Sequence, residues 1–283
     1  HYSSRRQRQM CIRDRYPPIE SIRELTDSYK TYLNKRFGVS NIENENILNL
    51  GGTREGTFSV IQSLFNRSLK LKKPFIYMPN PFYQIYGGAS LFAGAISRHI
   101  NLNEEKDFVL DLDSVSENQW QKCQILIMCS PSNPTGSVMK REEILKVIKL
   151  SRKYNFYIVS DECYIDIYRK KPPESFIQVS IEKYGNMKNI VSLHSLSKRS
   201  NLPGFRSGMI CGDKKLINNF KKYRAFHGVS IPLPIQMASS AAWKDEKTVF
   251  KNRDFYKENF ELAKKILNYD APEGAFYLSL IHI

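Results

Sequence analysis

The chain has 283 residues, of which 41% are hydrophobic and 25% charged, so it can bury a large core as one domain or two unequal ones. Its net charge of +15 comes from basic residues scattered along the sequence, without the basic run or recognition signature that is typical of nucleic-acid-binding proteins. No apolar run is long enough to span a membrane and no secretory pattern opens the chain, which together indicate a cytoplasmic protein.

Helical and strand patterns alternate along the sequence. Apolar residues with a helical period predict helices at about 22–38, 55–65, 86–93, 141–154, 214–226, 234–243 and 247–267. Short apolar runs predict strands at 74–78, 95–102, 125–129, 156–159, 190–193 and 208–212, and a polar linker from residue 39 runs into a further short apolar stretch at 47–50. Such alternation predicts an α/β fold with a mostly parallel sheet and helices on both of its faces, a three-layer α/β/α domain.

The two ends of the chain look foreign to the rest. Residues 10–15, Met-Cys-Ile-Arg-Asp-Arg, can be encoded by DNA whose reverse complement reads Leu-Ser-Leu-Ile-His-Ile, which is residues 278–283. One DNA element in opposite orientations at both ends is typical of a library adapter. We therefore predict that residues 1–15 and 278–283 are translated adapter and not part of the fold.

A single lysine, Lys198, lies among small polar residues between the predicted strands 190–193 and 208–212. This pattern predicts a lysine in a loop at a strand end, where it can form a Schiff base with an aldehyde once it has lost its proton. Arg206 can supply the positive charge that favours this loss, and its planar guanidinium can bind a phosphate. A lysine imine and a phosphate anchor together indicate pyridoxal 5′-phosphate, although a solvated basic loop would explain either residue alone.

Two further stretches are compatible with such a cofactor. Gly51 and Gly52 precede a predicted helix, so backbone N–H groups near Thr53 can approach an anion there; a Gly-Gly turn capped by the threonine is the alternative. Tyr83 follows a proline-rich turn at 79–82 and can stack on a flat ring, or simply pack in the core.

Polar side chains also follow the ends of several predicted strands. They are Asn133, Asp161, Tyr164, Ser195, Lys198 and Arg206. Ligands of open α/β sheets bind beyond the carboxyl ends of the strands, so we expect these side chains to converge. Asp161 can cap a helix or form an ion pair with a pyridinium nitrogen, and the pattern leaves both roles open.

Three of these motifs carry a resemblance to a known family. They are Asn-Pro-Thr-Gly at 133–136, Asp-x-x-Tyr at 161–164, and Ser-x-Ser-Lys at 195–198 followed by Arg206. With them the chain resembles the fold type I pyridoxal-phosphate-dependent aminotransferases, the aspartate aminotransferase superfamily of class I and II. The stretches 16–18, 52–55, 79–86 and 195–208 are most similar to its N-succinyldiaminopimelate aminotransferase branch.

The resemblance implies roles for the residues nearest the cofactor ring. Lys198 would carry the cofactor as a Schiff base and move the proton at the substrate. Asp161 would keep the pyridine nitrogen protonated, Tyr164 and Asn133 would hydrogen-bond the 3′-oxygen, and Tyr83 would stack on the ring. Pro134 would follow a cis peptide bond.

It also implies how the phosphate is bound and how subunits assemble. The phosphate would be held by Arg206, Ser195 and the backbone at Gly52, Thr53 and Arg54. Tyr16 would reach the phosphate of a second subunit, which implies a homodimer with shared active sites.

A domain division follows from the same resemblance. Residues 16–38 would be the N-terminal part of a small α+β domain, 39–245 the large cofactor-binding domain, and 246–277 a connector helix and the start of the C-terminal small domain. In this family the arginine that binds the substrate carboxylate lies later in the small domain. We therefore expect the 283-residue chain itself to be inactive.

The implied reaction moves an amino group from glutamate, leaving 2-oxoglutarate, to N-succinyl-2-amino-6-oxopimelate in lysine and diaminopimelate biosynthesis. The motifs equally allow another aminotransferase, or a β-lyase or decarboxylase of the same fold. Alternatives that are not enzymes are a ligand-sensing regulator with this fold, an inactive fragment, and a nucleic-acid-binding protein without a cofactor. The cysteines Cys123, Cys129, Cys163 and Cys211 show no metal-site spacing, so we expect buried reduced thiols and no metal.

Overall fold

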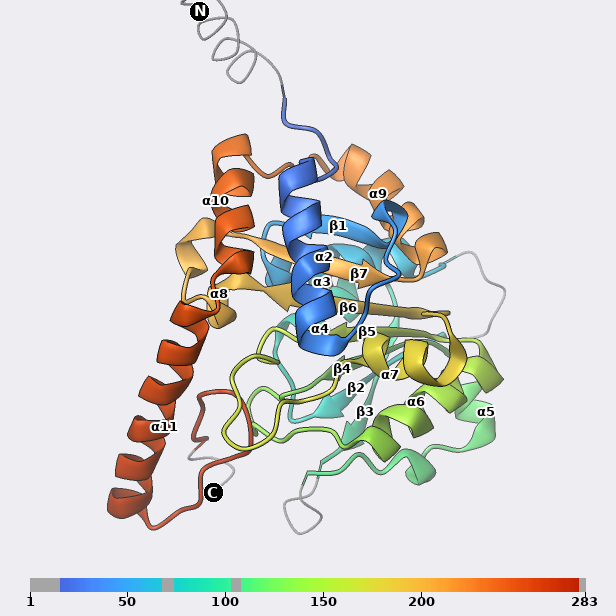
Figure 1. Ribbon diagram of the computed structural model, residues 1–283. Coiled ribbons are helices and arrows are strands. Elements are labelled where there is room, and N and C mark those ends of the chain that lie inside the picture. Colours follow the sequence, from blue (N-terminus) through green and yellow to red (C-terminus); the bar gives the residue numbers. More distant parts are fainter. Residues whose placement is uncertain (1–15, 68–73, 103–107, 280–283) are drawn as a thin grey trace, which may run out of the picture.

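The structure, a computed structural model, describes residues 16–67, 74–102 and 108–279. The predicted adapter at 1–15 and residues 280–283 of its counterpart lie outside the described residues. Within the described part, one seven-stranded sheet has helices on both faces, and a long helix runs down one side of the molecule (Figure 1).

The strands follow the order β1-β7-β6-β5-β4-β2-β3 across the sheet. Their bounds are β1 Ile47–Leu50, β2 Phe75–Asn80, β3 Ile96–Asn101, β4 Cys123–Cys129, β5 Tyr157–Asp161, β6 Ile190–Ser195 and β7 Gly208–Gly212. Neighbouring strands from β6 to β3 pair in parallel, whereas β7 runs antiparallel to both of its neighbours, β1 and β6. The prediction of a mostly parallel sheet is thus confirmed.

Two separate apolar clusters cover the two faces of the sheet. One face packs against helices α2 (Arg23–Phe37), α6 (Arg141–Tyr154) and α7 (Phe176–Tyr184), and the other against α3 (Thr53–Leu64), α4 (Ile85–Phe92) and α9 (Lys214–His227). Successive strand residues alternate between the clusters, as Ile158 and Val159 do in β5. This arrangement confirms the three-layer α/β/α architecture.

The remaining elements are shorter or lie at the edges. They are α5 Glu117–Trp120, α8 Leu196–Arg199, α10 Leu233–Lys244, α11 Lys247–Leu267 and the 3₁₀ turns Asn44–Asn46, Leu112–Ser114 and Pro203–Phe205. Helices with a strong local pattern have the bounds that the sequence predicts. In α6, Ile144, Val147 and Ile148 form one buried face, and Asn155 ends the helix in the left-handed conformation.

Helix α2 packs alongside α10 and contributes Tyr29 and Leu33 to the core of the sheet (Figure 1). After α11 the chain turns back toward the sheet, where the backbone N–H of Gly274 donates to the carbonyl of Gly136 and that of Ala275 to Ile167. The segment 272–277 is thereby fixed beside the loops that follow β4 and β5. The division into 16–38, 39–245 and 246–277 stays a prediction.

The structure differs from the sequence prediction around the lysine. Strands β5 and β6 continue to Asp161 and Ser195, because both residues still pair with a neighbouring strand although their side chains are polar. Lys198 then lies in the one-turn helix α8 and not in a loop. The peptide bond before Pro134 is cis as predicted, and those before Pro81 and Pro131 are also cis.

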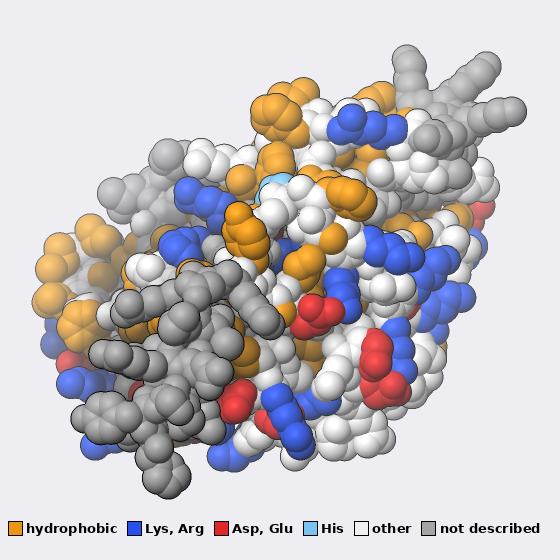
Figure 2. Space-filling view, turned by 90° about the horizontal axis from the view of Figure 1, so that it is seen from above, with side chains coloured by type: hydrophobic (Ala, Val, Ile, Leu, Met, Phe, Trp, Pro, Cys, Tyr) orange, Lys and Arg blue, Asp and Glu red, His pale blue; other side chains and the backbone are white. Residues whose placement is uncertain are grey.

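In the described residues, no helix is long and apolar enough to cross a membrane. Among the same residues, no group of three His, Cys, Asp or Glu side chains is placed to hold a metal ion. Cys123, Cys129, Cys163 and Cys211 are buried free thiols, as predicted. On the face shown in Figure 2, basic side chains are interspersed with acidic, uncharged and apolar ones.

Candidate active site

A cavity of about 480 Å³ opens where the parallel strands β4, β5 and β6 end. It is lined by Thr53, Arg54, Tyr83, Asn133, Asp161, Cys163, Tyr164, Ser195, Ser197, Lys198, Pro203, Arg206 and Tyr277. Of the residues predicted for the site, Gly52 lies at its edge against Arg206, and Tyr16 lies outside these lining residues with its side chain 99% exposed. The predicted convergence of strand-end residues is therefore present in one place.

Asp161 closes the inner end of the cavity at the last position of β5. Its side chain is 3% exposed, Oδ2 accepts a hydrogen bond from the hydroxyl of Tyr86 at 3.0 Å, and Oδ1 accepts from the backbone N–H of Cys163 at 3.2 Å. Burial raises the pKa of this carboxyl above its ordinary value, although both donors oppose that rise. A buried carboxylate of this kind gains from a cationic partner in the cavity.

Lys198 reaches the cavity from α8. Ser195 caps this helix through Oγ, which accepts a hydrogen bond from the backbone N–H of Ser197 at 3.1 Å. The Nζ atom of Lys198 lies 4.9 Å from the ring centroid of Phe276 and 5.7 Å from that of Tyr164. The amine therefore stands between aromatic faces from the C-terminal segment and from the turn after β5.

A corner suited to an anion lies where α3 begins, and we call it the anion-binding corner. Gly52, with φ of 88°, precedes the helix, and a Cβ atom at this position would come within 2.5 Å of a guanidinium nitrogen of Arg206. The first backbone N–H groups of a helix, here those from Thr53 onward, have no hydrogen-bond partner within the helix. They form the positive end of the helix dipole, which attracts an anion. Arg206 donates to the carbonyls of Pro203 and Gly51 at 2.9 and 3.1 Å, so its guanidinium is fixed against this corner.

Aromatic side chains line the remaining sides. The hydroxyl of Tyr83 accepts a hydrogen bond from Nε of Arg54 at 2.6 Å, and its ring meets that of Tyr86 edge-on. The hydroxyls of Tyr164 and Tyr277 are hydrogen-bonded to each other. Burial raises the pKa of Tyr277 to about 12 and raises the pKa of Tyr164 even further, so both phenols are protonated at neutral pH and one donates to the other.

Sequence reasoning assigned no role to several residues of this site: Tyr86, Cys163, Ser197, Phe276 and Tyr277. Tyr86 belongs to the stretch 79–86 that carries part of the family resemblance, which was a usable signal. Phe276 and Tyr277 come directly before the predicted adapter, and only the return of the chain after α11 brings them to the lysine.

The residues present fit pyridoxal 5′-phosphate. The close approach of Arg206 to Gly52, which a Cβ atom would obstruct, leaves a corner of N–H and guanidinium donors suited to a phosphate. Lys198 supplies a primary amine for an aldehyde, and the buried Asp161 supplies a carboxylate for a ring nitrogen.

Comparisons with known proteins agree with this chemistry. The sequence model of the family described as "Aminotransferase class I and II" matches residues 5–280. The crystal structure of an aminotransferase from Neisseria meningitidis superposes with a TM-score of 0.89 and 37% sequence identity, covering 95% of this chain and 70% of that one.

Two further proteins bear on the branch of the family. An LL-diaminopimelate aminotransferase from Aquifex aeolicus is 30% identical over 89% of this chain and 64% of its own length. A probable N-succinyldiaminopimelate aminotransferase from Thermus thermophilus has a TM-score of 0.78 and 24% identity over 87% of this chain and 64% of that one, which shows the fold alone. The chain thus spans about two thirds of the length of such relatives.

Proposed function

The chain belongs to the class I and II aminotransferases, and on that premise we propose that it transfers an amino group between glutamate and N-succinyl-2-amino-6-oxopimelate. The observation that carries the proposal is the convergence of Lys198, Asp161 and Arg206 on one cavity at the ends of the parallel strands. An amine, a buried carboxylate and a phosphate-binding corner are the three groups that transamination with pyridoxal phosphate requires of its protein.

Bound in this cavity, pyridoxal phosphate supplies an aldehyde that condenses with amines and a ring that accepts the electron pair left when a Cα–H bond breaks. Lys198 would supply the amine for that condensation, and its Nζ would carry the proton from the substrate Cα to C4′ of the cofactor, or from C4′ to Cα when the amino group moves in the opposite direction. Asp161 keeps a proton on the ring nitrogen by offering a buried negative charge.

Other side chains hold and orient the cofactor. Arg206 and the N-terminus of α3 would bind its phosphate, with Ser195 in the lining of the same cavity. Tyr164 and Asn133, which line the same cavity, would hydrogen-bond its phenolic oxygen, and Tyr83 would stack on its ring. Asn133, Tyr164 and Ser195 come from the ends of β4, β5 and β6. Tyr83 follows β2, Arg206 precedes β7 and α3 follows β1, so the cofactor would be held by side chains and backbone from several elements at once.

The succinylated acceptor rests on the similarity of stretches 16–18, 52–55, 79–86 and 195–208 to the N-succinyldiaminopimelate branch. A second candidate is LL-diaminopimelate itself, because several relatives, including the one from Aquifex aeolicus, are named LL-diaminopimelate aminotransferases. Both candidates place the reaction in diaminopimelate and lysine biosynthesis.

Turnover in the reverse direction separates these candidates. The protein encoded by the complete reading frame at the source locus is supplied with 2-oxoglutarate and either N-succinyl-LL-diaminopimelate or LL-diaminopimelate, and glutamate is measured. We expect at least about ten-fold higher kcat/KM for the succinylated substrate. A preference for LL-diaminopimelate would establish the second candidate, and no glutamate from either would favour a lyase or a decarboxylase.

We also propose a homodimer with shared active sites. Tyr16 supports it, because its side chain is 99% exposed and lies apart from the cavity of its own chain. In the dimer, its hydroxyl would reach the phosphate bound by the second subunit. Mixing Tyr16→Phe protein with Lys198→Ala protein tests this arrangement. Each heterodimer would contain one site with both substitutions and one site with neither, so transaminase activity would reappear on mixing.

A further inference from the structure

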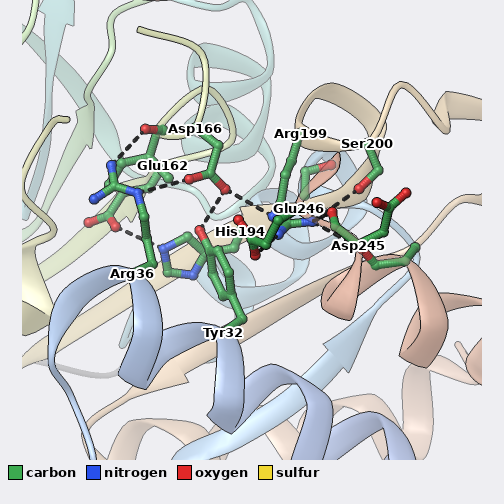
Figure 3. Close-up of polar contacts among 12 residues, drawn as sticks. Tyr32, Arg36, Glu162, Asp166, His194, Arg199, Ser200, Asp245 and Glu246 are labelled. Carbon is green, nitrogen blue, oxygen red and sulfur yellow. Dashed lines mark hydrogen bonds and ion pairs between the residues drawn. The ribbon is translucent and has the colours of Figure 1, made fainter. Parts of the chain in front are cut away.

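Arg199, the residue after Lys198, is a charged side chain with only 2% exposure. Lys198 lines the cavity, whereas Arg199 is enclosed by the aromatic rings of Tyr32 and Trp243, whose centroids lie 4.9 and 5.4 Å from its guanidinium carbon. One turn of α8 therefore presents its lysine to the active site. Its arginine lies among buried polar side chains of the protein interior (Figure 3).

The guanidinium of Arg199 holds the corner between α10 and α11. Nη1 donates to the carbonyls of Ala242 at 3.0 Å and Asp245 at 3.4 Å, and Nη2 forms an ion pair with Glu246 at 2.8 Å. The carbonyl of Arg199 accepts from Asn252, in the second turn of α11, at 3.4 Å. Both the side chain and the backbone of this residue thus join α8 to the start of α11.

On its other side the guanidinium meets a buried carboxylate. Nε of Arg199 lies 3.1 Å from Oδ2 of Asp166, which also accepts a hydrogen bond from the hydroxyl of Tyr32 at 2.9 Å. Oδ1 of Asp166 accepts from Nε of Arg36, on α2, at 2.9 Å. Asp166 follows β5 by five residues, so α8 is held between the turn after β5 and the α10–α11 corner (Figure 3).

Helix α8 has only four residues, and a single turn of helix is not stable by itself in water. Its orientation must therefore be set by tertiary contacts, and the buried, charged contacts of Arg199 are among those it makes outside its own turn. The chain that follows α11 returns Phe276 to within 4.9 Å of Nζ of Lys198. The start of α11 is thus connected to α8 through Arg199, and the segment that follows α11 contacts the lysine through Phe276.

We propose that Arg199 is a positioning residue that fixes the amine of Lys198 in the cavity and transmits the placement of α11 to it. The inference rests on the proposed function and deepens it, since it names the side chain that orients the reacting amine. Because the guanidinium forms contacts in several directions at once, a lysine ammonium cannot replace it.

The test measures the amine of Lys198 directly, without cofactor. The 283-residue apo-protein is treated briefly with acetic anhydride, and acetylation of Lys198 is quantified by peptide mass spectrometry relative to the exposed Lys149 on α6. We expect acetic anhydride to acetylate Lys198 at least about three-fold faster in Arg199→Met than in the wild type, because a less firmly held α8 exposes the amine. Arg199→Lys should lie near Arg199→Met.

Arg36→Met is the matched control, because it removes a different guanidinium from Asp166 and leaves α8 untouched. It should keep the wild-type acetylation rate at Lys198. Glu246→Gln weakens only the ion pair of Arg199 at the start of α11 and leaves its ion pair with Asp166 intact. The acetylation rate of Lys198 should therefore lie between those of the wild type and Arg199→Met. This variant still tests the inference if Arg199→Met fails to fold. A wild-type rate in folded Arg199→Lys and Glu246→Gln would overturn the inference.

A second readout distinguishes failure of this inference from failure of the proposed function. Wild-type protein is titrated with pyridoxal phosphate, and the absorbance of the lysine adduct is followed. We expect the apparent Kd to rise at least about five-fold in Arg199→Lys and not in Arg36→Met. If the wild type forms no adduct, the proposed function fails, while the acetylation rates still decide whether Arg199 positions the lysine.

Discussion

The hydroxyl of Tyr86, on α4, donates a hydrogen bond to Oδ2 of Asp161 across 3.0 Å in an environment closed to solvent. Burial raises the pKa of Tyr86 well above its ordinary value, so the phenol is a protonated donor at neutral pH. With Oδ1 held by the backbone N–H of Cys163, the carboxylate is fixed in both directions. Its orientation toward the cavity is therefore set before any cofactor binds.

Replacing Asp161 by asparagine should stabilise the apo-protein while it removes function. The folded-state pKa of Asp161 is raised by burial, so at pH 7 folding must keep an ionised carboxylate where its charge is disfavoured. Asparagine removes that penalty, and we expect about 1 kcal/mol more unfolding free energy at pH 7 by urea denaturation, a gain that vanishes toward pH 4.

The companion variant Tyr86→Phe should act in the opposite direction. It keeps the charge of Asp161 but removes one of its donors, so we expect a loss of about 1–2 kcal/mol in unfolding free energy at pH 7. If both variants change stability in the same direction, the carboxylate is not the strained group of the apo-site.

Replacing Lys198 by alanine should abolish covalent attachment of pyridoxal phosphate. In the 283-residue chain, borohydride reduction after incubation with the cofactor should add one cofactor mass to the peptide that contains Lys198 in the wild type and none in Lys198→Ala. Lys149→Ala, on the exposed side of α6, is the control and should label like the wild type. Equal labelling of Lys198→Ala would show that the amine acts elsewhere.

The sequence predicts what depends on neighbours along the chain. The bounds of α6 and α11 follow from apolar periodicity. The position of Asp161 at the end of β5 and that of Lys198 shortly after β6 follow from apolar runs that stop at polar residues. Because parallel strands end at the same edge of a sheet, placing these residues in one cavity needed no long-range information.

Contacts between distant segments are what the sequence could not supply. Tyr86 and Asp161 are 75 residues apart, and Arg199 and Glu246 are 47 apart, so no periodicity relates them. The helical form of α8 was also missed, because four residues carry no period and its turn is held by contacts from α10 and α11.

The pair Glu162–His194 should make stability depend on pH. Burial alone would raise the pKa of Glu162, but hydrogen bonds from Nε2 of His194 at 3.0 Å and from the backbone N–H of Phe176 at 3.0 Å outweigh it and lower the pKa below its ordinary 4.5. A lowered folded-state pKa stabilises the protein above the unfolded-state value, and this contribution is lost as pH falls through the folded one.

We therefore expect Glu162→Gln to lose about 3 kcal/mol of unfolding free energy at pH 7, and a deficit that shrinks steadily below about pH 4.5. Urea denaturation at a series of pH values gives both numbers. Glu142→Gln, an exposed carboxyl in the first turn of α6, should follow the wild type throughout. A deficit that is independent of pH would mean that packing, and not charge, makes Glu162 important.

Adding one methyl group at Gly52 should destroy the anion-binding corner, whereas the same change at Gly51 should not. Gly52 has φ of 88°, and its added Cβ would lie 2.5 Å from a guanidinium nitrogen of Arg206, so the backbone or the guanidinium must move away from the first N–H groups of α3. At Gly51 the nearest atom, Oε2 of Glu55, would lie at 3.5 Å, which is ordinary contact distance.

We expect Gly52→Ala to weaken binding of pyridoxal phosphate at least about ten-fold, and Gly51→Ala to change it less than about two-fold. Isothermal titration with inorganic phosphate isolates the corner from the rest of the site, since phosphate has neither the ring nor the aldehyde. Phosphate affinity should fall in Gly52→Ala as cofactor affinity does. If the cofactor weakens but phosphate binds as in the wild type, the phosphate group is held elsewhere and Arg206 does not anchor it.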